Sequence, residues 1–301
     1  MKKILIILIS CLLITSSNAD NFKNNLENKF QSKFYSKIDE ISQDLSATLA
    51  EKLSSNERIK YLDLTIGLQE KLKPTFEIQS VNKLKENSDS VWFNQTNIIS
   101  HDSDTTINFG IGKRKLFNNE TLMAGFNGFL DYQIDEEHFR KGVGFETVSN
   151  SLDLIGNYYE AISGFKTTDD GREKALDGYD LKLNYHLPNK KNTDLFAQIF
   201  EWENPNTSYE QEGEKYGFST VIGNFSFTAG YLNDNKNNDG YFGNIKLFIR
   251  LGEEATSQSN EQNKTNEKKL SMRSKLFMPV QRENKIKVVK ISKSGVKISG
   301  F

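Results

Sequence analysis

Residues 180–187 read Asp-Leu-Lys-Leu-Asn-Tyr-His-Leu, a strict alternation of polar and apolar side chains. Successive side chains of a β-strand point to opposite faces of the sheet, so this stretch has one polar and one apolar face. The same period of two recurs at residues 225–231 and, with Phe248 as an exception on the polar side, at residues 244–251. Such strands fit either a soluble sandwich over a core or a barrel whose apolar face meets lipid.

The length and number of the alternating segments separate these two folds. Most segments have ten residues or more, longer than the roughly five or six of soluble sheets and close to the about 9–11 of a tilted membrane-crossing strand. About twelve are expected, and an even number closes a sheet with both ends on one side. We therefore predict an all-β, antiparallel transmembrane barrel over residues 60–252. The predicted strands are 60–69, 74–84, 91–101, 104–116, 120–133, 138–149, 151–164, 175–187, 193–203, 212–222, 224–233 and 240–252.

The connections between the predicted strands alternate in length. Those at residues 117–119, Asn150 and Gly223 are tight, whereas those at residues 165–174, 204–211 and 234–239 are long and polar. Outer-membrane barrels have short periplasmic turns and longer outer loops. The first outer loop, near Lys71–Lys73, is short and fits this pattern less well.

The amino-terminal residues indicate export. Lys2 and Lys3 precede an apolar run that ends at Ile14, and small residues at 17–19 form a cleavage site, so residues 1–19 are predicted to be a cleaved signal peptide. Residues 20–56 carry an apolar residue at every third or fourth position and are predicted to form a periplasmic amphipathic helix. The apolar stripe over residues 26–53 indicates docking under the barrel or self-association, with a membrane surface as the alternative.

Composition excludes several kinds of site. Cys11, in the signal peptide, is the only cysteine, so the mature chain has no disulfide or thiolate site. Because 39 basic residues balance 40 acidic ones, nucleic acid is not an expected partner. His101, His138 and His186 stand in no motif beside a serine, so we expect no catalytic residue, although lipases exist among barrels of this size. Residues 135–137 are an acidic run that we expect to be solvated in an outer loop, so no metal or cofactor is expected.

Several short strings, taken in order, resemble the β-barrel of the intimin/invasin family of inverse autotransporters. Arg273-Ser274-Lys275-Leu276 and residues 280–286 resemble the segment that follows the barrel in that family. The barrel strings are Asn108–Arg114, Gly125–Tyr132, Arg140–Glu146, Asn157–Tyr159, Ser163–Phe165, Ala175–Asp180 and Leu187-Pro188.

This resemblance implies a twelve-stranded outer-membrane barrel that works in type V secretion. In the family, the carboxy-terminal linker threads through the pore and presents an adhesive passenger outside, and barrel-assembly machinery and periplasmic chaperones are the implied partners. Here no peptidoglycan-binding domain is apparent before the barrel. The residues after 269 are fewer than the roughly 100 of one immunoglobulin-like domain, so a member without a passenger is expected. A passive channel and a surface scaffold or small adhesin, acting through residues 165–174 and 204–211, are the alternative functions.

The strand alternation places a set of glycines and charged residues inside the barrel. We expect the glycines to form a lane for the linker and the charged residues to hold it by charge-assisted hydrogen bonds. The alternative is that the glycines only relieve crowding where strands bend. The candidates are Gly110, Gly112, Arg114, Gly125, Asn127, Asp131, Arg140, Gly142, Gly144 and Glu146.

Residues 253–269 are polar and without periodicity, which predicts a flexible linker. A chain extended from Gly252 to Leu270 reaches roughly 60 Å, more than the about 40–45 Å of a bilayer with its headgroups. The carboxy-terminal segment, residues 270–301 with a strand-like stretch near Val288, can therefore lie either at the outer surface or inside the lumen.

Overall fold

The computed structural model describes residues 58–70, 72–102, 104–168, 171–188, 190, 192–251, 271–292 and 295–299. The predicted signal peptide, the helix over residues 20–56 and the linker over residues 253–269 lie outside these residues. Among the described residues, no helix has the length and apolar character needed to cross a membrane.

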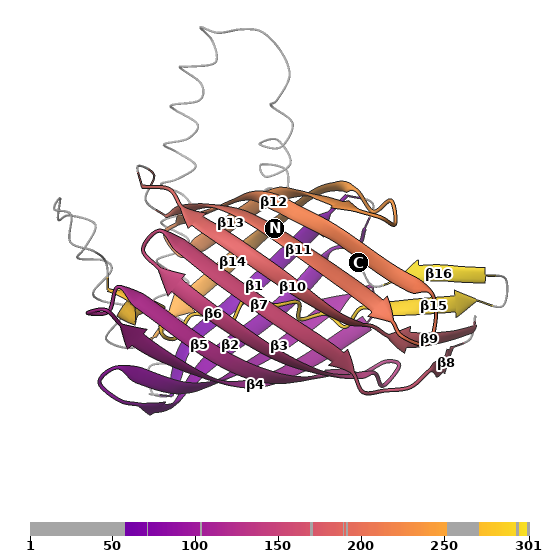
Figure 1. Ribbon diagram of the computed structural model, residues 1–301, viewed down its shortest axis with the longest axis horizontal. Helices are drawn as coiled ribbons and strands as arrows, with labels where there is room; N and C mark the ends of the chain where they lie inside the picture. Colours follow the sequence, from indigo (N-terminus) through magenta and orange to yellow (C-terminus); the bar gives the residue numbers. More distant parts are fainter. Residues whose placement is uncertain are drawn as a thin grey trace, which may run out of the picture.

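Twelve antiparallel strands form a closed barrel, which confirms the predicted fold class (Figure 1). The barrel closes where the first strand pairs with the last, from Tyr61 opposite Arg250 to Gln69 opposite Phe242. The twelve strands are β1 (Ile59–Gln69), β2 (Thr75–Glu86), β3 (Ser90–His101), β4 (Asp104–Phe117), β5 (Leu122–Gln133), β6 (Phe139–Ser149), β7 (Leu152–Ala161), β10 (Asp177–His186), β11 (Thr193–Asn204), β12 (Tyr209–Ile222), β13 (Phe225–Asp234) and β14 (Gly240–Arg250).

The alternation in the sequence becomes the two faces of the barrel wall. Phe126 and Val143, on neighbouring strands, are 73% and 62% exposed on the outer face. Asp131 and Arg140, on the same two strands, are fully buried on the inner face. A wall that is apolar outside and polar inside is the arrangement of a membrane-spanning barrel.

The two ends of the barrel differ, and we name them by their connections. The turn end carries the tight connections, including Asn118 and Asn119, whose φ angles of 51° and 53° lie in the left-handed region that asparagine tolerates. The loop end carries the connections after β5, β7 and β11. The connection after β7 was predicted to be a polar loop over residues 165–174. It instead folds into a hairpin of β8 (Lys166–Thr168) and β9 (Gly171–Ala175).

The carboxy-terminal segment runs through the lumen from the turn end to the loop end (Figure 1). It begins with a short 3₁₀ helix, η1 (Met272–Lys275), and leaves the lumen as β15 (Val288–Ser292). β15 pairs with β9, and β16 (Gly295–Ser299) pairs with β15, so a four-stranded sheet β16-β15-β9-β8 extends the loop end. We call residues 272–287 the threaded segment.

The lumen at the turn end is apolar, whereas only glycines and polar or charged residues were predicted to lie inside the barrel. Met272, Leu276, Phe277 and Val280 of the threaded segment pack into a buried cluster with inward side chains of the wall. The wall members are Tyr61, Val81, Val91, Phe93, Leu116, Met123, Phe129, Val148 and Phe248. Since burial of apolar area is the main favourable term in packing, this cluster holds the start of the threaded segment inside the barrel.

Candidate functional site: the threaded segment and its lumen contacts

Arg114 of β4 holds the beginning of the threaded segment. Its Nε lies 2.6 Å from Oε1 of Glu146 on β6, and both side chains are at most 5% exposed. Its Nη1 donates to the carbonyl oxygen of Leu276 at 2.8 Å and to that of Met278. One guanidinium thus joins a buried carboxylate of the wall to the backbone of the threaded segment, using the fixed fork of donors that arginine supplies.

Asp131 of β5 forms a second centre near the other end of the segment. Its carboxylate lies 2.8 Å from Nε of Arg140 on β6 and 2.7 Å from Nη2 of Arg282, which belongs to the threaded segment. Arg140 donates in turn to the carbonyl oxygens of Glu283 at 2.7 Å and Lys285 at 3.2 Å. Charge-assisted bonds of this kind are stronger than neutral ones, and here they connect wall and segment in both directions.

Neutral side chains of the wall extend the same pattern to further backbone groups. Gln95 Oε1 accepts from the backbone N–H of Val280 at 2.8 Å, and the Tyr159 hydroxyl accepts from that of Glu283 at 2.7 Å. Asn157 and Asn108 donate to the carbonyl oxygens of Gln281 and Asn284 at 3.0 and 2.9 Å. The wall therefore contacts mainly the backbone of an extended chain, which every residue type carries.

Sequence reasoning missed these neutral contact residues. Gln95, Asn108, Asn157 and Tyr159 all lie at inward positions of the alternation, between zero and 6% exposed. Their common signal is an uncharged polar side chain on the inner face of a strand, which among the ten predicted residues only Asn127 has.

All ten predicted lumen residues lie on the inner face, but the five glycines have different neighbours. A Cβ at Gly110, Gly112, Gly125 or Gly144 would first meet side chains of the wall, at 2.3 to 2.6 Å. Only the one at Gly142 would first meet the threaded segment, 3.1 Å from Arg282 Nη2. Asn127 is one of the wall side chains beside Gly144.

Two of these glycines act on the segment through aromatic rings. Gly110 leaves room for Phe129, over whose ring the guanidinium of Arg282 lies at 4.2 Å. Gly112 leaves room for Phe93, over whose ring that of Arg114 lies at 4.5 Å. Gly110 and Gly112 thus make space for the rings of two cation–π contacts.

A salt bridge fastens the threaded segment at the turn end. Arg273 pairs with Glu120, in the turn between β4 and β5, and also donates to the carbonyl oxygen of Ser88. The Ser271 hydroxyl donates to the same carboxylate, and the backbone N–H of Met272 donates to the Glu120 carbonyl at 2.7 Å. The hydrogen bond from Arg273, with that from Ser271, lowers the pKa of Glu120 below its ordinary value.

At the loop end, Glu173 of β9 joins the emerging chain to the barrel. Its carboxylate lies 3.0 Å from His138 Nε2 and 3.2 Å from Lys290 Nζ on β15. Burial raises the pKa of Glu173, but the bond from His138 and the charge of Lys290 outweigh it and hold the pKa below its ordinary value. The carboxylate therefore stays charged where β15 leaves the lumen.

No sequence motif places a serine beside a histidine, but the fold brings Ser163 to His138. Ser163 Oγ lies 3.0 Å from Nδ1 of His138, whose Nε2 faces Glu173. The imidazole is fully buried and the serine oxygen also accepts from the backbone N–H of Phe139 at 3.1 Å, so the three groups join β6 to the β8–β9 hairpin. The sequence hid this grouping because the partners lie 25 and 35 residues from the histidine.

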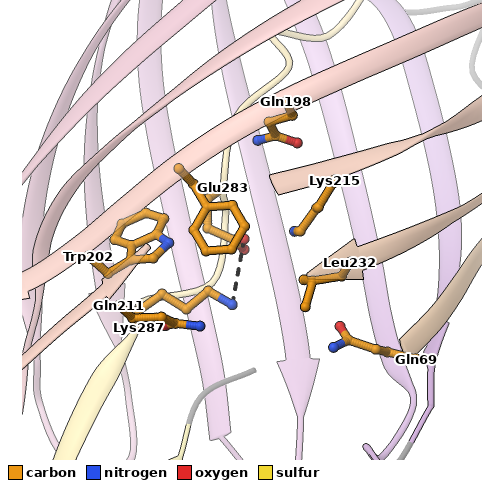
Figure 2. Close-up of a pocket in the computed structure, with 9 residues that line it drawn as sticks. Gln69, Gln198, Trp202, Gln211, Lys215, Leu232, Glu283 and Lys287 are labelled. Atoms are coloured by element: carbon orange, nitrogen blue, oxygen red, sulfur yellow. Dashed lines mark ion pairs between the residues drawn. The ribbon is translucent and has the colours of Figure 1, made fainter. Parts of the chain in front are cut away.

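A small cavity lies between the threaded segment and the wall at β11–β13 (Figure 2). Glu283 and Lys287, 3.7 Å apart, project into it from the segment, and the ammonium of Lys215 faces them from the wall. The other residues that line it are Gln69, Gln198, Phe200, Trp202, Gln211 and Leu232. These polar groups suit water, so the segment does not fill this side of the lumen completely.

A twelve-stranded barrel with its own carboxy-terminal chain inside the lumen defines a class of membrane β-barrel. A family model described as "Inverse autotransporter, beta-domain" matches residues 14–284. The chain therefore belongs to the inverse autotransporter β-domain family, and its barrel is of the outer-membrane kind.

The relatives of known name are partial matches. An attaching and effacing protein homolog of Escherichia coli (strain K12) is 35% identical over 32% of this chain and 33% of its own length. An invasin of Yersinia enterocolitica is 32% identical over 33% of this chain and 12% of its own length. The chain thus spans about a third or less of the length of these relatives.

A solved structure described in work on the in-meso crystallization of membrane proteins shares the fold. It has a TM-score of 0.64 and 18% identity, and the match covers 79% of this chain and all of that one.

Proposed function

We propose that the protein is an outer-membrane translocator of the type V, inverse autotransporter kind, which carries its own carboxy-terminal chain to the cell surface. In this proposal a signal peptide is cleaved after residue 19, the turn end faces the periplasm and the loop end faces outward. The outer face of the barrel meets outer-membrane lipid. Periplasmic chaperones and the barrel-assembly machinery insert the barrel, and the stripe over residues 26–53 associates with itself or docks under it.

The observation that carries this proposal is the contact of wall side chains with the backbone of the threaded segment. Arg114 and Arg140 donate to carbonyl oxygens from Leu276 to Lys285. Since carbonyl oxygens recur at every residue, the same arginines can hold a chain of any sequence as it moves past them. This mode of contact favours a transport path over a binding site for one ligand.

The two ends of the threaded segment support an outward direction. Its start is fastened at Glu120 on the turn end, and its end continues into β15 beside the β8–β9 hairpin on the loop end. A chain that follows β15 would therefore be displayed outside the cell. This display agrees with the names of the relatives, an attaching and effacing protein homolog and an invasin. We propose a non-enzymatic role, either the display of such a chain or adhesion through the loop-end sheet itself.

Single-cysteine labelling in intact cells tests the direction of threading. A cysteine at Lys290, which is 35% exposed at the loop end, should react with a membrane-impermeant maleimide. A cysteine at Ser271, exposed at the turn end, should react only after the outer membrane is opened. Asn284 is a poor reporter, because it is 8% exposed inside the lumen.

A cysteine at Asn237, in the loop between β13 and β14, serves as the positive control for surface access. Labelling at Asn237 with protection at Lys290 would contradict the proposed export of the chain. Labelling of Ser271 in intact cells would reverse the assigned orientation of the barrel.

A further inference from the structure

Three carboxylates meet at the loop end, close to the point where β15 leaves the lumen. One ligand oxygen from each of Asp104, Asp135 and Glu136 lies within 4.8 Å of the others. Asp104 begins β4, and the other two residues lie in the loop between β5 and β6. The cluster therefore joins the start of β4 to the neighbouring loop, which also contacts β4 through the backbone N–H of Ile134 and the carbonyl oxygen of Thr105 at 2.9 Å.

One lysine, Lys290, lies near this cluster; its charge acts on Asp104 and Glu136, but its ammonium pairs with Glu173. None of the three carboxylates forms an ion pair with a described lysine or arginine side chain. The nearby cations serve other carboxylates: Lys290 lies 3.2 Å from Glu173, and Lys166 lies 3.6 Å from Glu137. Three like charges at this separation repel one another unless a cation joins them.

Gln133 provides an independent sign of a ligand position. Its side chain is 2% exposed, and Nε2 donates to Glu136 Oε2 at 2.8 Å, so the amide is directed into the cluster. Its Oε1 is buried and has no hydrogen-bond partner among the described residues. A rotation of the amide by half a turn exchanges these two atoms and brings the free oxygen to the carboxylates, where a cation would accept it as a ligand.

We propose that Asp104, Asp135, Glu136 and the amide oxygen of Gln133 form a Ca²⁺ site. Carboxylate and amide oxygens are the ligands of hard cations. Ca²⁺ accepts a flexible set of about six to eight oxygen ligands, whereas Mg²⁺ demands near-ideal octahedral geometry and keeps several waters, so carboxylates drawn from a strand end and a loop suit Ca²⁺ better. Exposed Asp135 leaves room for water to complete the coordination. Bound Ca²⁺ fixes the β5–β6 loop against β4 beside the exit of the threaded segment.

The site is tested by titrating Ca²⁺ into the refolded full chain in detergent micelles by isothermal titration calorimetry, with Mg²⁺ in parallel. The wild type is expected to bind one Ca²⁺ with a Kd of about 10⁻⁴–10⁻³ M, the range of extracellular modules, and to bind Mg²⁺ more weakly. Asp104→Asn and Glu136→Gln each remove a charged ligand and should raise the Kd at least about tenfold. Gln133→Met keeps the volume, removes the amide oxygen and should also raise the Kd.

Glu210→Gln is the matched control, because it neutralises another exposed carboxylate at the same end of the barrel and should leave the Kd unchanged. Far-UV circular dichroism shows whether each variant is folded. A second readout needs no variant: the wild type should unfold at a higher temperature in Ca²⁺ than in a chelator. No saturable binding, equal affinity for Mg²⁺, binding that survives Asp104→Asn with Glu136→Gln, or no change in unfolding temperature would each overturn the site.

Discussion

At the scale of single residues, the buried arginines of the wall decide how the threaded segment is held. Arg114 is 1% exposed and contacts both a wall carboxylate and the backbone of the segment. Arg140 has the same double role, with Asp131 as its carboxylate. The arginine of each pair also donates hydrogen bonds to the segment. Substituting this arginine therefore removes both the ion pair in the wall and the bonds that hold the segment.

Arg114→Met should therefore lower the free energy of unfolding by about 3–5 kcal/mol, the usual cost of leaving the partner charge buried and unpaired. The measurement is urea-induced unfolding of the refolded chain in lipid vesicles, followed by tryptophan fluorescence. The double variant Arg114→Met with Glu146→Gln should recover part of the loss, because no unpaired charge is then left in the lumen.

Lys113→Met is the matched control for this substitution, because Lys113 neighbours Arg114 on the same strand and points to the outer face. Equal stability of the Arg114→Met and Lys113→Met variants would show that the Arg114–Glu146 pair does not hold the lumen together.

At the scale of elements, the segment is fastened differently at its two ends. At the loop end, β15 adds a strand to β9, so backbone hydrogen bonds hold it in addition to the Lys290–Glu173 pair. At the turn end, the carboxylate of Glu120 receives Arg273 and Ser271 and adds to the apolar packing of Met272 and Leu276. The bonds to the Glu120 carboxylate depend on pH, whereas the strand pairing of β15 with β9 does not.

The pKa of Glu120 is lowered in the folded protein, so its contribution is present above the ordinary value of 4.5 and is lost as the pH falls through the lowered value. We expect backbone amides of residues 272–276 to exchange hydrogen faster below that range, while amides of β15 keep their protection. Hydrogen–deuterium exchange with mass spectrometry, corrected for the intrinsic pH dependence of exchange, makes the comparison. The Glu120→Gln variant should show the loosened turn end at every pH, and a turn end that loosens with acid in this variant too would assign the effect to another group.

At the scale of the whole molecule, the threaded segment is part of the interior of the barrel and occupies the lumen. Its apolar residues share a buried cluster with Phe93, Leu116 and Phe248 of the wall. Removing the segment would expose this apolar surface to water as well as the arginines that it covers.

Deletion of residues 271–301 should therefore raise the single-channel conductance in planar lipid bilayers well above that of the full chain and also lower the thermal stability of the barrel. A chain that ends after Lys287 is the control, since it lacks β15 and β16 but keeps the threaded segment and should stay nearly closed. Equal conductance of the two truncated chains would mean that the loop-end sheet, not the segment, closes the barrel.

The sequence by itself determined the barrel and the face on which each wall residue lies. Alternation is a relation between neighbours in the chain, so the inward position of Arg140 and the outward position of Val143 follow from residues 140–146 alone. The contacts of the lumen are of another kind, because Arg114 and Leu276 are 162 residues apart and meet only once the sheet has closed. Tertiary structure alone decided that the carboxy-terminal chain lies in the lumen, that Asp131 lies between Arg140 and Arg282, and that β9 receives β15. The physical reason is that closure of the barrel brings together side chains whose separation along the chain leaves no local pattern.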